Sequence, residues 1–240
     1  MTKFAEIKQL MPRTRIRWNQ TIPLMIMIVM VSVGTTQAQQ RFSGYGGMGV
    51  IYYKADGLSN YLNYVAPGSV LPKSFTSAIR FFFGGEYAVS KDWAIGIDYG
   101  YITKSVSGGN SIGSQQVNMA YSLPSLAIRR ILRAEGYSIR LGGEFGYHFG
   151  SVSASSPYSS QTQDYSASGF GVKLNGSVDT QLDKRLYARI GVEGDAEFIG
   201  DLKARDGSKL TYLDYNSGKL IPVNMDLLGV GLSFGLVYYF

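Results

Sequence analysis

The last twelve residues, "GVGLSFGLVYYF" at positions 229–240, alternate between two kinds of side chain. Successive side chains of a β-strand point to opposite faces. One face of this stretch is wholly apolar, ending in Phe240, whereas the other consists mostly of glycine and serine. A soluble antiparallel sheet usually exposes a polar face. The pattern therefore favours a strand whose apolar face meets lipid and whose small face lines a narrow lumen.

The same alternation recurs after residue 40 and predicts eight strands. In "SFTSAIRFFFGGEYAVS", Ile79 and Phe81 share one face while Arg80 and Glu86 share the other. The remaining stretches are "DWAIGIDYGYITK", "VNMAYSLPSLAIRR", "YSIRLGGEFGYHFG", "GFGVKLNGSVDTQL", "LYARIGVEGDAEFIG" and a glycine-rich first strand, "RFSGYGGMGVIYY". Glycine specifies register weakly, so the faces of this first strand remain open.

A proline interrupts the fourth predicted strand, which alternates up to Leu123 and then meets Pro124. Proline cannot donate a hydrogen bond to a strand partner and is typical of bulges. We therefore expect a bulge there, after which Leu126 and Ile128 take the outer face.

The connections between these strands alternate in length. Short charged turns are expected at Ser90–Asp92, Arg133–Gly136 and Asp183–Arg185, and long polar loops at 55–73, 105–116, 151–167 and 201–224. The last loop contains "KLTYLDYNSGKLIP", which extends the final hairpin beyond the membrane or forms an extra strand pair. Each arm of such a pair is shorter than the ~9–11 residues of a spanning strand.

Residues 1–38 read as a signal peptide. Five basic residues precede the apolar run "IPLMIMIVMVSV" at 22–33, and small residues lead to a cleavage site after Ala38. An uncleaved anchor is the alternative, but a spanning helix needs about 20 apolar residues. We expect residues 39–240 to form one outer-membrane β-barrel domain.

Composition narrows the function classes. The 240 residues include no cysteine, which excludes disulfides, thiol catalysis and thiolate metal sites. Five of the 23 basic residues and one of the 17 acidic residues lie in the first 38 positions, leaving 18 basic and 16 acidic residues. So small an excess gives no basic stripe for nucleic acid.

Together these features predict an all-β fold, an eight-stranded antiparallel up-and-down transmembrane β-barrel. In hydrocarbon every amide must be paired, so the sheet must close. Eight strands leave an interior that side chains can fill. A soluble lipocalin-like carrier is the alternative, with its apolar faces inside and its charges in solvent. The terminal aromatic residue and the alternating loop lengths favour the membrane barrel.

Residues 41–240 resemble the small outer-membrane barrels of the OmpA/OmpX/OmpW-like group and the outer membrane protein beta-barrel domain family. The closing "LVYYF" is similar to the C-terminal aromatic signal that the barrel-insertion machinery reads. The resemblance thus implies an assembly signal at Leu236, Tyr238 and Phe240. "YSLPSLAIR" is similar to a Tyr-x-x-Pro-x-Leu element of a middle strand in that family. No peptidoglycan-binding domain follows the barrel in this sequence, so cell-wall anchoring is not expected.

If the apolar faces point outward, charged side chains of both signs line the lumen. Buried charges persist when paired and hydrogen-bonded, so we expect a salt-bridge network that fills the barrel. Its expected centre is Arg140 with Glu144, facing Lys173 and Arg189 with Glu193. A narrow ion path gated by these pairs is the alternative. The complete predicted set is Arg80, Glu86, Asp98, Lys104, Arg140, Glu144, His148, Lys173, Asp179, Arg189, Glu193, Asp195 and Glu197.

Catalysis is not expected. An acyl hydrolase needs a nucleophile beside a base, and the one histidine, His148, has Ser151 three residues on, which in a strand points to the opposite face. The spacing also departs from the His-x-Ser of the deacylase relatives. No metal cluster, P-loop or dinucleotide motif stands out, so no catalytic, cofactor or metal residue is predicted.

The sequence therefore favours an integral outer-membrane protein with a filled lumen, both termini in the periplasm and a structural or surface-interaction role. A small-solute channel and, further off, a lipid-A-modifying enzyme are the alternatives. The expected partners are outer-membrane lipid and lipopolysaccharide, the insertion machinery and an extracellular ligand at the loops, with no nucleic acid and a monomeric state. Candidate loop contacts are Tyr158, Tyr165, Tyr212 and Tyr215.

Overall fold

The computed structural model describes residues 41–240 apart from 66–76, 111–112, 157–158 and 215–216. Of the two units into which the chain divides, the one described is Gln39–Phe240. The expected signal peptide and its cleavage after Ala38 lie outside the described residues and stay predictions.

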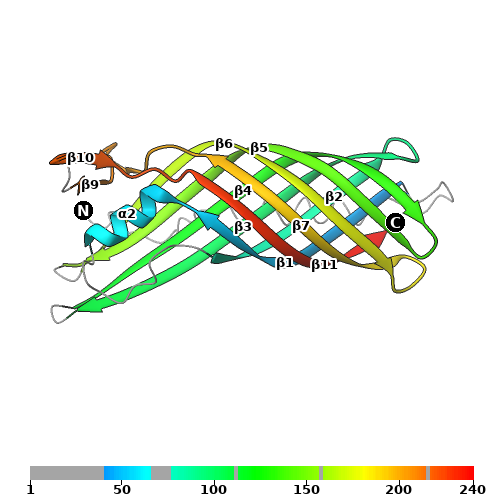
Figure 1. Ribbon diagram of the computed structural model, residues 1–240, viewed down its shortest axis with the longest axis horizontal. Helices are drawn as coiled ribbons and strands as arrows, with labels where there is room; N and C mark the ends of the chain where they lie inside the picture. The colour runs from blue at the N-terminus through cyan, green and yellow to red at the C-terminus, as the bar shows by residue number, and fades with distance from the viewer. Residues whose placement is uncertain (1–40, 66–76, 111–112, 157–158, 215–216) are drawn as a thin grey trace, which may run out of the picture. The chain divides into compact units, whose positions relative to one another are not determined.

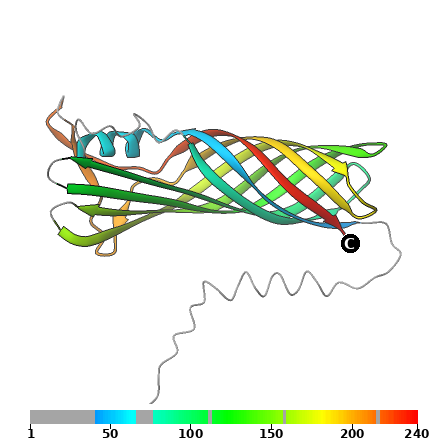
Figure 2. The ribbon, with the colours of Figure 1, turned by 90° about the horizontal axis from the view of Figure 1, so that it is seen from below.

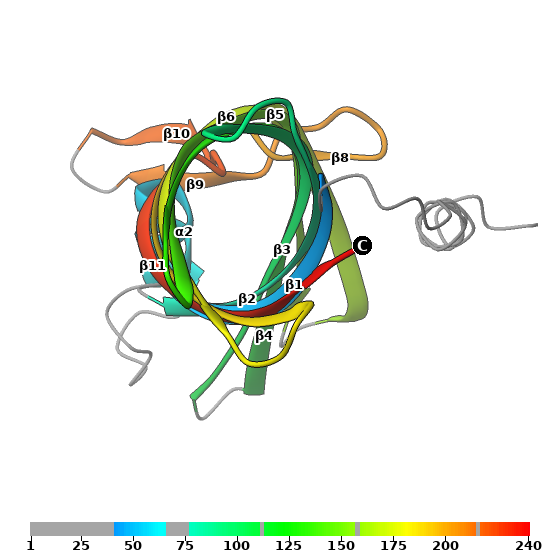
Figure 3. The same ribbon diagram turned by 90° about the vertical axis from the view of Figure 1, so that its right-hand side faces the viewer.

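Eight long strands form one closed antiparallel barrel, which confirms the predicted fold class (Figure 1). Each strand pairs with its neighbours in sequence, and β1 with β11 and β5 with β6 complete the ring (Figure 3). The strands are β1 (Phe42–Lys54), β2 (Ser77–Ala88), β3 (Trp93–Asn110), β4 (Gly113–Ala134), β5 (Tyr137–Ser156), β6 (Ser159–Gln181), β7 (Leu186–Phe198) and β11 (Leu227–Tyr239).

Short connections gather at one end of the barrel, which we call the turn end. The loop between β4 and β5 is only two residues long, and its Gly136 has a φ of 79° that other residues rarely adopt. The first and last strand residues meet at the same end, where the Phe240 amide donates to the Phe42 carbonyl oxygen at 3.1 Å (Figure 2). Closure therefore places the end of the chain against its first strand.

The faces of the strands divide as the alternation predicts, and apolar side chains are exposed around the whole barrel. Leu174 keeps 73% of its surface exposed and Leu126 69%. We call this outward surface the belt; it includes Met48, Val50, Ile79, Phe81, Phe83, Ile95, Ile97, Leu126, Ile128, Leu141, Phe145, Val172, Leu174, Ile190, Val192, Val230, Leu232 and Phe234. Most charged side chains on the lumen face of the strands are buried, opposite to the arrangement in a soluble carrier.

The bulge expected at Pro124 is wrong. The register between β3 and β4 is unbroken through Tyr99↔Pro124, and odd-numbered side chains point inward on both sides of the proline. The ladder from β4 to β5 lacks only the pairs of Leu123 and Pro124 and resumes in the same register at Ser125↔Gly146. The strand therefore tolerates the missing donor without a change of face.

The opposite end, which we call the cap end, has more regular structure than the expected loops. Helix α2 (Asp56–Val65) lies within the predicted first loop, and β3–β4 and β5–β6 continue as long hairpins through the second and third. The fourth loop contains β8 (Lys203–Ala204), which pairs with β6, and a separate two-stranded sheet of β9 (Thr211–Asp214) and β10 (Lys219–Pro222). Its "KLTYLDYNSGKLIP" segment is thus an extra strand pair outside the barrel sheet. Within the described residues, no helix is long and apolar enough to cross a bilayer.

An apolar core fills the lumen towards the cap end, where the sequence pattern suggested only small and charged side chains. Ile51, Ile102 and Val152 point inward from the barrel, and Leu58 of α2 and Met225 pack with them. All five side chains are completely buried. The loops therefore supply part of a conventional hydrophobic core, which we call the apolar layer.

Candidate functional site

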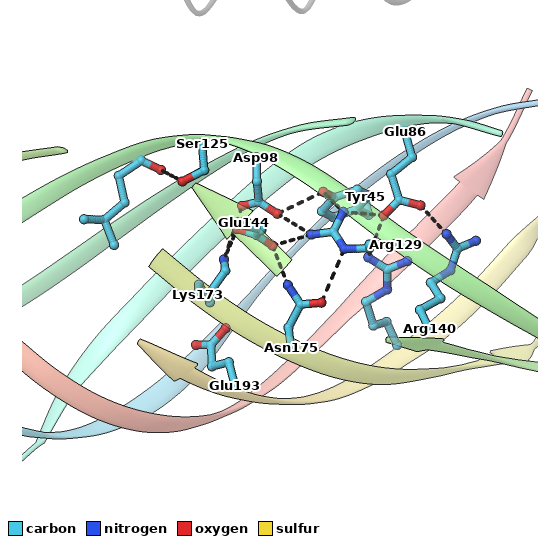
Figure 4. A network of polar contacts seen from close by, with 12 residues as sticks. Tyr45, Glu86, Asp98, Ser125, Arg129, Arg140, Glu144, Lys173, Asn175 and Glu193 are labelled. Carbon is cyan, nitrogen blue, oxygen red and sulfur yellow. Dashed lines mark hydrogen bonds and ion pairs between the residues drawn. The ribbon is translucent and has the colours of Figure 1, made fainter. Parts of the chain in front are cut away.

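The lumen towards the turn end contains a cluster of buried charged side chains, which we call the ionic layer. Arg129 of β4 lies at its centre and pairs with three carboxylates from three other strands (Figure 4). Its Nη1 lies 2.5 Å from Glu86 Oε1 and its Nη2 3.1 Å from Asp98 Oδ2, and Glu144 also accepts from Nη2. The Tyr45 hydroxyl joins the cluster by donating to Asp98 at 2.9 Å.

A second group surrounds Asp179, whose carboxylate bridges two arginines. Arg140 Nε donates to Asp179 Oδ2 at 2.6 Å, and Arg189 Nε donates to Oδ1 at 2.7 Å. Arg140 also pairs with Glu86, which is shared with Arg129 and so links the two groups. The Arg189 guanidinium lies 4.4 Å from the ring centroid of Tyr45, within range of a cation–π contact.

The remaining charges extend the network to β2 and β7. Arg80 Nη1 lies 2.7 Å from Glu193 Oε1 and 3.3 Å from Asp195 Oδ1. Lys173 pairs with Glu144, as Figure 4 shows. All eight long strands of the barrel contribute a side chain to this network, since the Tyr239 hydroxyl of β11 accepts from Arg140. The layer therefore cross-links the wall through its interior.

The structure places the predicted lumen residues inside, with one difference. Eleven of them are buried residues, and the side chain of Glu193 is 8% exposed. Lys104 is only half-buried, and no ion pair of this side chain is found among the described residues. The expected central pair also differs, because Arg140 bonds Glu86 and Asp179 while Glu144 bonds Arg129 and Lys173.

The sequence analysis did not include Arg129 among the lumen residues, although the alternation of the strand predicts an inward side chain at this position. Leu126 and Ile128 were assigned to the outer face, and a residue that follows an outward residue in a strand must point inward. Tyr45 was missed for a different reason, since the glycine-rich β1 gives no register. Pairing of Tyr45 with Gly84 of β2 and Val237 of β11 fixes it.

His148 lies between the ionic and apolar layers in a three-residue arrangement. Its Nδ1 contacts Glu197, and its Nε2 lies 3.0 Å from Ser125 Oγ. Gly171 makes room for this contact, since a Cβ there would collide with both His148 and Glu197. Ser151 is exposed on the outer face, as the spacing predicted. The serine beside the histidine is thus Ser125, 23 residues away in sequence, which spacing could not identify.

The lumen is filled at both levels. The cavity among the ionic side chains measures about 30 Å³, room for one or two water molecules. Beyond it, the apolar layer is made of side chains with almost no exposed surface. Among the described residues, no group of three or more histidine or acidic side chains is arranged to hold a metal ion.

Two of the four loop tyrosines lie within the described residues. Tyr158 and Tyr215 lie outside the described residues. Tyr165 and Tyr212 are partly buried against the apolar layer. The Tyr212 ring lies 6.5 Å from that of Tyr64, and its hydroxyl accepts from Asn60 Nδ2 at 3.2 Å. These two tyrosines therefore pack the cap.

Comparisons with known proteins support the fold. No protein-family model and no curated protein matches the chain. A major outer membrane protein from Thermus thermophilus has a TM-score of 0.52 at 13% identity, over 83% of this chain and 99% of that one. OprG from Pseudomonas aeruginosa (TM-score 0.47, 15% identity, 83% and 95% covered) and Ail from Yersinia pestis (0.47, 12%, 83% and 98%) are further similar structures. The chain has the fold of an outer-membrane β-barrel.

Proposed function

We propose that this protein is an integral outer-membrane barrel with a closed lumen, which serves as a structural scaffold and presents its cap to the cell exterior. The observation that carries the proposal is the inverted surface: the belt exposes apolar side chains while the ionic layer is buried. Hydrocarbon as the surrounding medium explains both, because buried ion pairs and exposed leucines are each unfavourable in water.

Membrane residence has a direct test. Protein from the outer-membrane fraction should migrate faster on a denaturing gel when unheated than when boiled, because a closed barrel resists detergent. Recovery in the soluble fraction with a single, heat-independent band would contradict the proposal.

Two filled layers in series support a barrel that does not conduct. The space in the ionic layer is about 30 Å³, and the apolar layer lies between it and the cap end. We expect no single-channel steps when the folded protein is added to a planar bilayer. Stable steps would favour the channel alternative.

Orientation follows from the two unequal ends. Short turns are typical of the periplasmic side of such barrels and longer segments of the outside, which supports a periplasmic location for both ends of the barrel domain. A protease-cleavable tag in the Asp183–Arg185 turn should be cut only after the outer membrane is permeabilised, and one in 215–218 should be cut in intact cells.

An acyl hydrolase is the second candidate function, because Ser125, His148 and Glu197 have the order and contacts of a nucleophile, a base and an orienting carboxylate. Burial of His148 and Glu197 beneath the apolar layer favours a structural role instead, since a substrate has no path to them. Mass spectrometry of lipid A from expressing cells separates the two. Acyl loss that Ser125→Ala abolishes would establish the hydrolase.

A further inference from the structure

A hollow of about 650 Å³ lies on the outward side of the barrel, where the belt gives way to polar residues towards the cap end. The edge of the hollow nearer the turn end is a row of four residues that pair across β3, β4, β5 and β6: Tyr101, Ser122, Phe149 and Ser168. The two aromatic rings are exposed and continue the belt. The hollow, which we call the outer groove, therefore opens directly onto the apolar surface.

The next row towards the cap end forms the floor of the outer groove. It runs from Ala120 through Ser151 and Ser166 and continues to Lys203 of β8, which is bridged to Lys209. Small side chains create the hollow, and exposed hydroxyls of Ser151 and Ser166 line it. A row of hydroxyls thus leads to two ammonium groups.

The charge at the end of this row is positive. Lys209 Nζ lies 2.7 Å from Asp201 Oδ2 and is largely neutralised there. Lys203 is exposed, and within the described residues no carboxylate pairs with it. Its ammonium group therefore remains available to an anion in the groove.

The hairpin that contains Lys203 also has a net positive charge. Residues 201–209, "DLKARDGSK", hold three basic and two acidic side chains, and Arg205 at the hairpin tip is exposed. The Asp206 carboxylate accepts hydrogen bonds from the hydroxyl and the amide of Ser208, and these hold its pKa below the usual range. The hairpin is therefore cationic at neutral pH.

We propose that the outer groove binds a phosphorylated, acylated saccharide of the surrounding outer leaflet. This inference rests on the proposed membrane residence. The phosphate would lie at Lys203, the sugar hydroxyls along Ser151 and Ser166, and the acyl chains beside Phe149 on the belt. An amphiphile fits better than a soluble sugar phosphate, because the aromatic row adjoins lipid and a soluble sugar phosphate has no acyl chain to contact it.

Native mass spectrometry tests this site on protein purified from the outer-membrane fraction in detergent. The probes are lipid A with both phosphates, the same lipid after dephosphorylation, and soluble glucosamine phosphate. Wild-type protein should retain the phosphorylated lipid over the other two. Lys203→Glu should weaken that binding about tenfold, because it removes a cation that attracts the anionic headgroup and adds repulsion.

A second variant and a control separate binding from folding. Ser151→Trp fills the groove without changing charge and should also reduce lipid retention, whereas Lys184→Glu in the turn at the opposite end should not. Heat-dependent migration shows that each variant is folded.

Three outcomes would overturn the inference: equal retention of the phosphorylated lipid by Lys203→Glu and wild type, equal binding of the dephosphorylated lipid, or tighter binding of soluble glucosamine phosphate. A barrel recovered folded from the outer membrane that binds no lipid A contradicts this inference alone; a protein absent from that fraction contradicts the proposed function.

Discussion

Arg129 has the largest number of carboxylate partners of any single side chain in the ionic layer. Glu86, Asp98 and Glu144 approach it from three strands, and its side chain is 5% exposed. Burial of three carboxylates near one another is unfavourable unless cations compensate them. The guanidinium therefore holds together groups that would otherwise repel.

Replacing Arg129 with methionine should destabilise the barrel by about 3–5 kcal/mol, the usual cost of leaving buried charges without a partner. Urea titration in lipid vesicles, followed by the gel shift of the folded form, measures the change. Arg130→Met is the matched control, because Arg130 is exposed on the outer face of the same strand. Equal midpoints for the two variants would show that the ionic layer contributes no stability.

At the level of the strand, one face of each long strand forms part of the belt and the other lines the lumen. β6 illustrates the division: Leu174 is 73% exposed, whereas its neighbour Lys173 is 7% exposed. In water this would be the less stable of the two arrangements, because it buries the charge and exposes the leucine. The preference of a strand for one orientation thus depends on the medium outside.

Leu174→Lys should cost about 2–4 kcal/mol in a bilayer, the range for a basic residue facing lipid near the midplane. Leu220→Lys is the control, since Leu220 is 68% exposed on β10 outside the barrel sheet and a surface change there should stay within about 0.5 kcal/mol. Vesicle-based unfolding titrations compare them. If both substitutions are neutral, the belt does not face hydrocarbon.

The last strand closes the barrel by pairing with β1, and the chain ends there in an aromatic cluster. The Phe240 ring lies 5.4 Å from that of Phe42 and 5.1 Å from that of Tyr238. Phe240→Ala should lower the amount of heat-modifiable protein in the outer membrane while leaving its synthesis unchanged, because the implied assembly signal and the contact with β1 are both weakened. Cell fractionation with gel analysis measures this. Tyr137→Ala, another exposed aromatic at the turn end, provides the comparison.

At the level of the whole molecule, two layers of different chemistry fill one lumen. The ionic layer joins strands through charge pairs, and the apolar layer joins the barrel to the cap through hydrophobic contacts. We expect the ionic layer alone to block the lumen, so that closure does not depend on the cap.

Replacing α2, residues 56–65, with a glycine-serine segment of equal length should lower the unfolding midpoint, since Leu58 and Tyr61 leave the apolar layer. The barrel should nevertheless stay closed to ions, because the ionic layer is intact. Planar-bilayer recording of this variant measures closure. Steady conductance would mean that the cap is the principal seal.

The sequence was enough to predict the number of long strands, the faces of every long strand except the glycine-rich β1, and the side of the wall on which most charges lie. The strands and faces follow from alternation, whereas the choice of the membrane barrel over a soluble carrier depended also on the terminal aromatic residue and the alternating loop lengths. Ile79 and Arg80 need no distant contact to be assigned to opposite faces. The change of pattern between Leu123 and Leu126 was a local signal too, but it was wrongly attributed to a bulge.

The pairing of the charges and the filling of the cap end became known only from the three-dimensional fold. Partners such as Arg129 with Glu86 depend on strand register and on how far long side chains reach across the lumen, and neither is encoded within one strand. The pairing of Ser125 with His148 has the same origin. The apolar layer combines side chains of the barrel with those of α2 and of residues 199–210 and 223–227, which are far apart in sequence and meet only in the folded barrel.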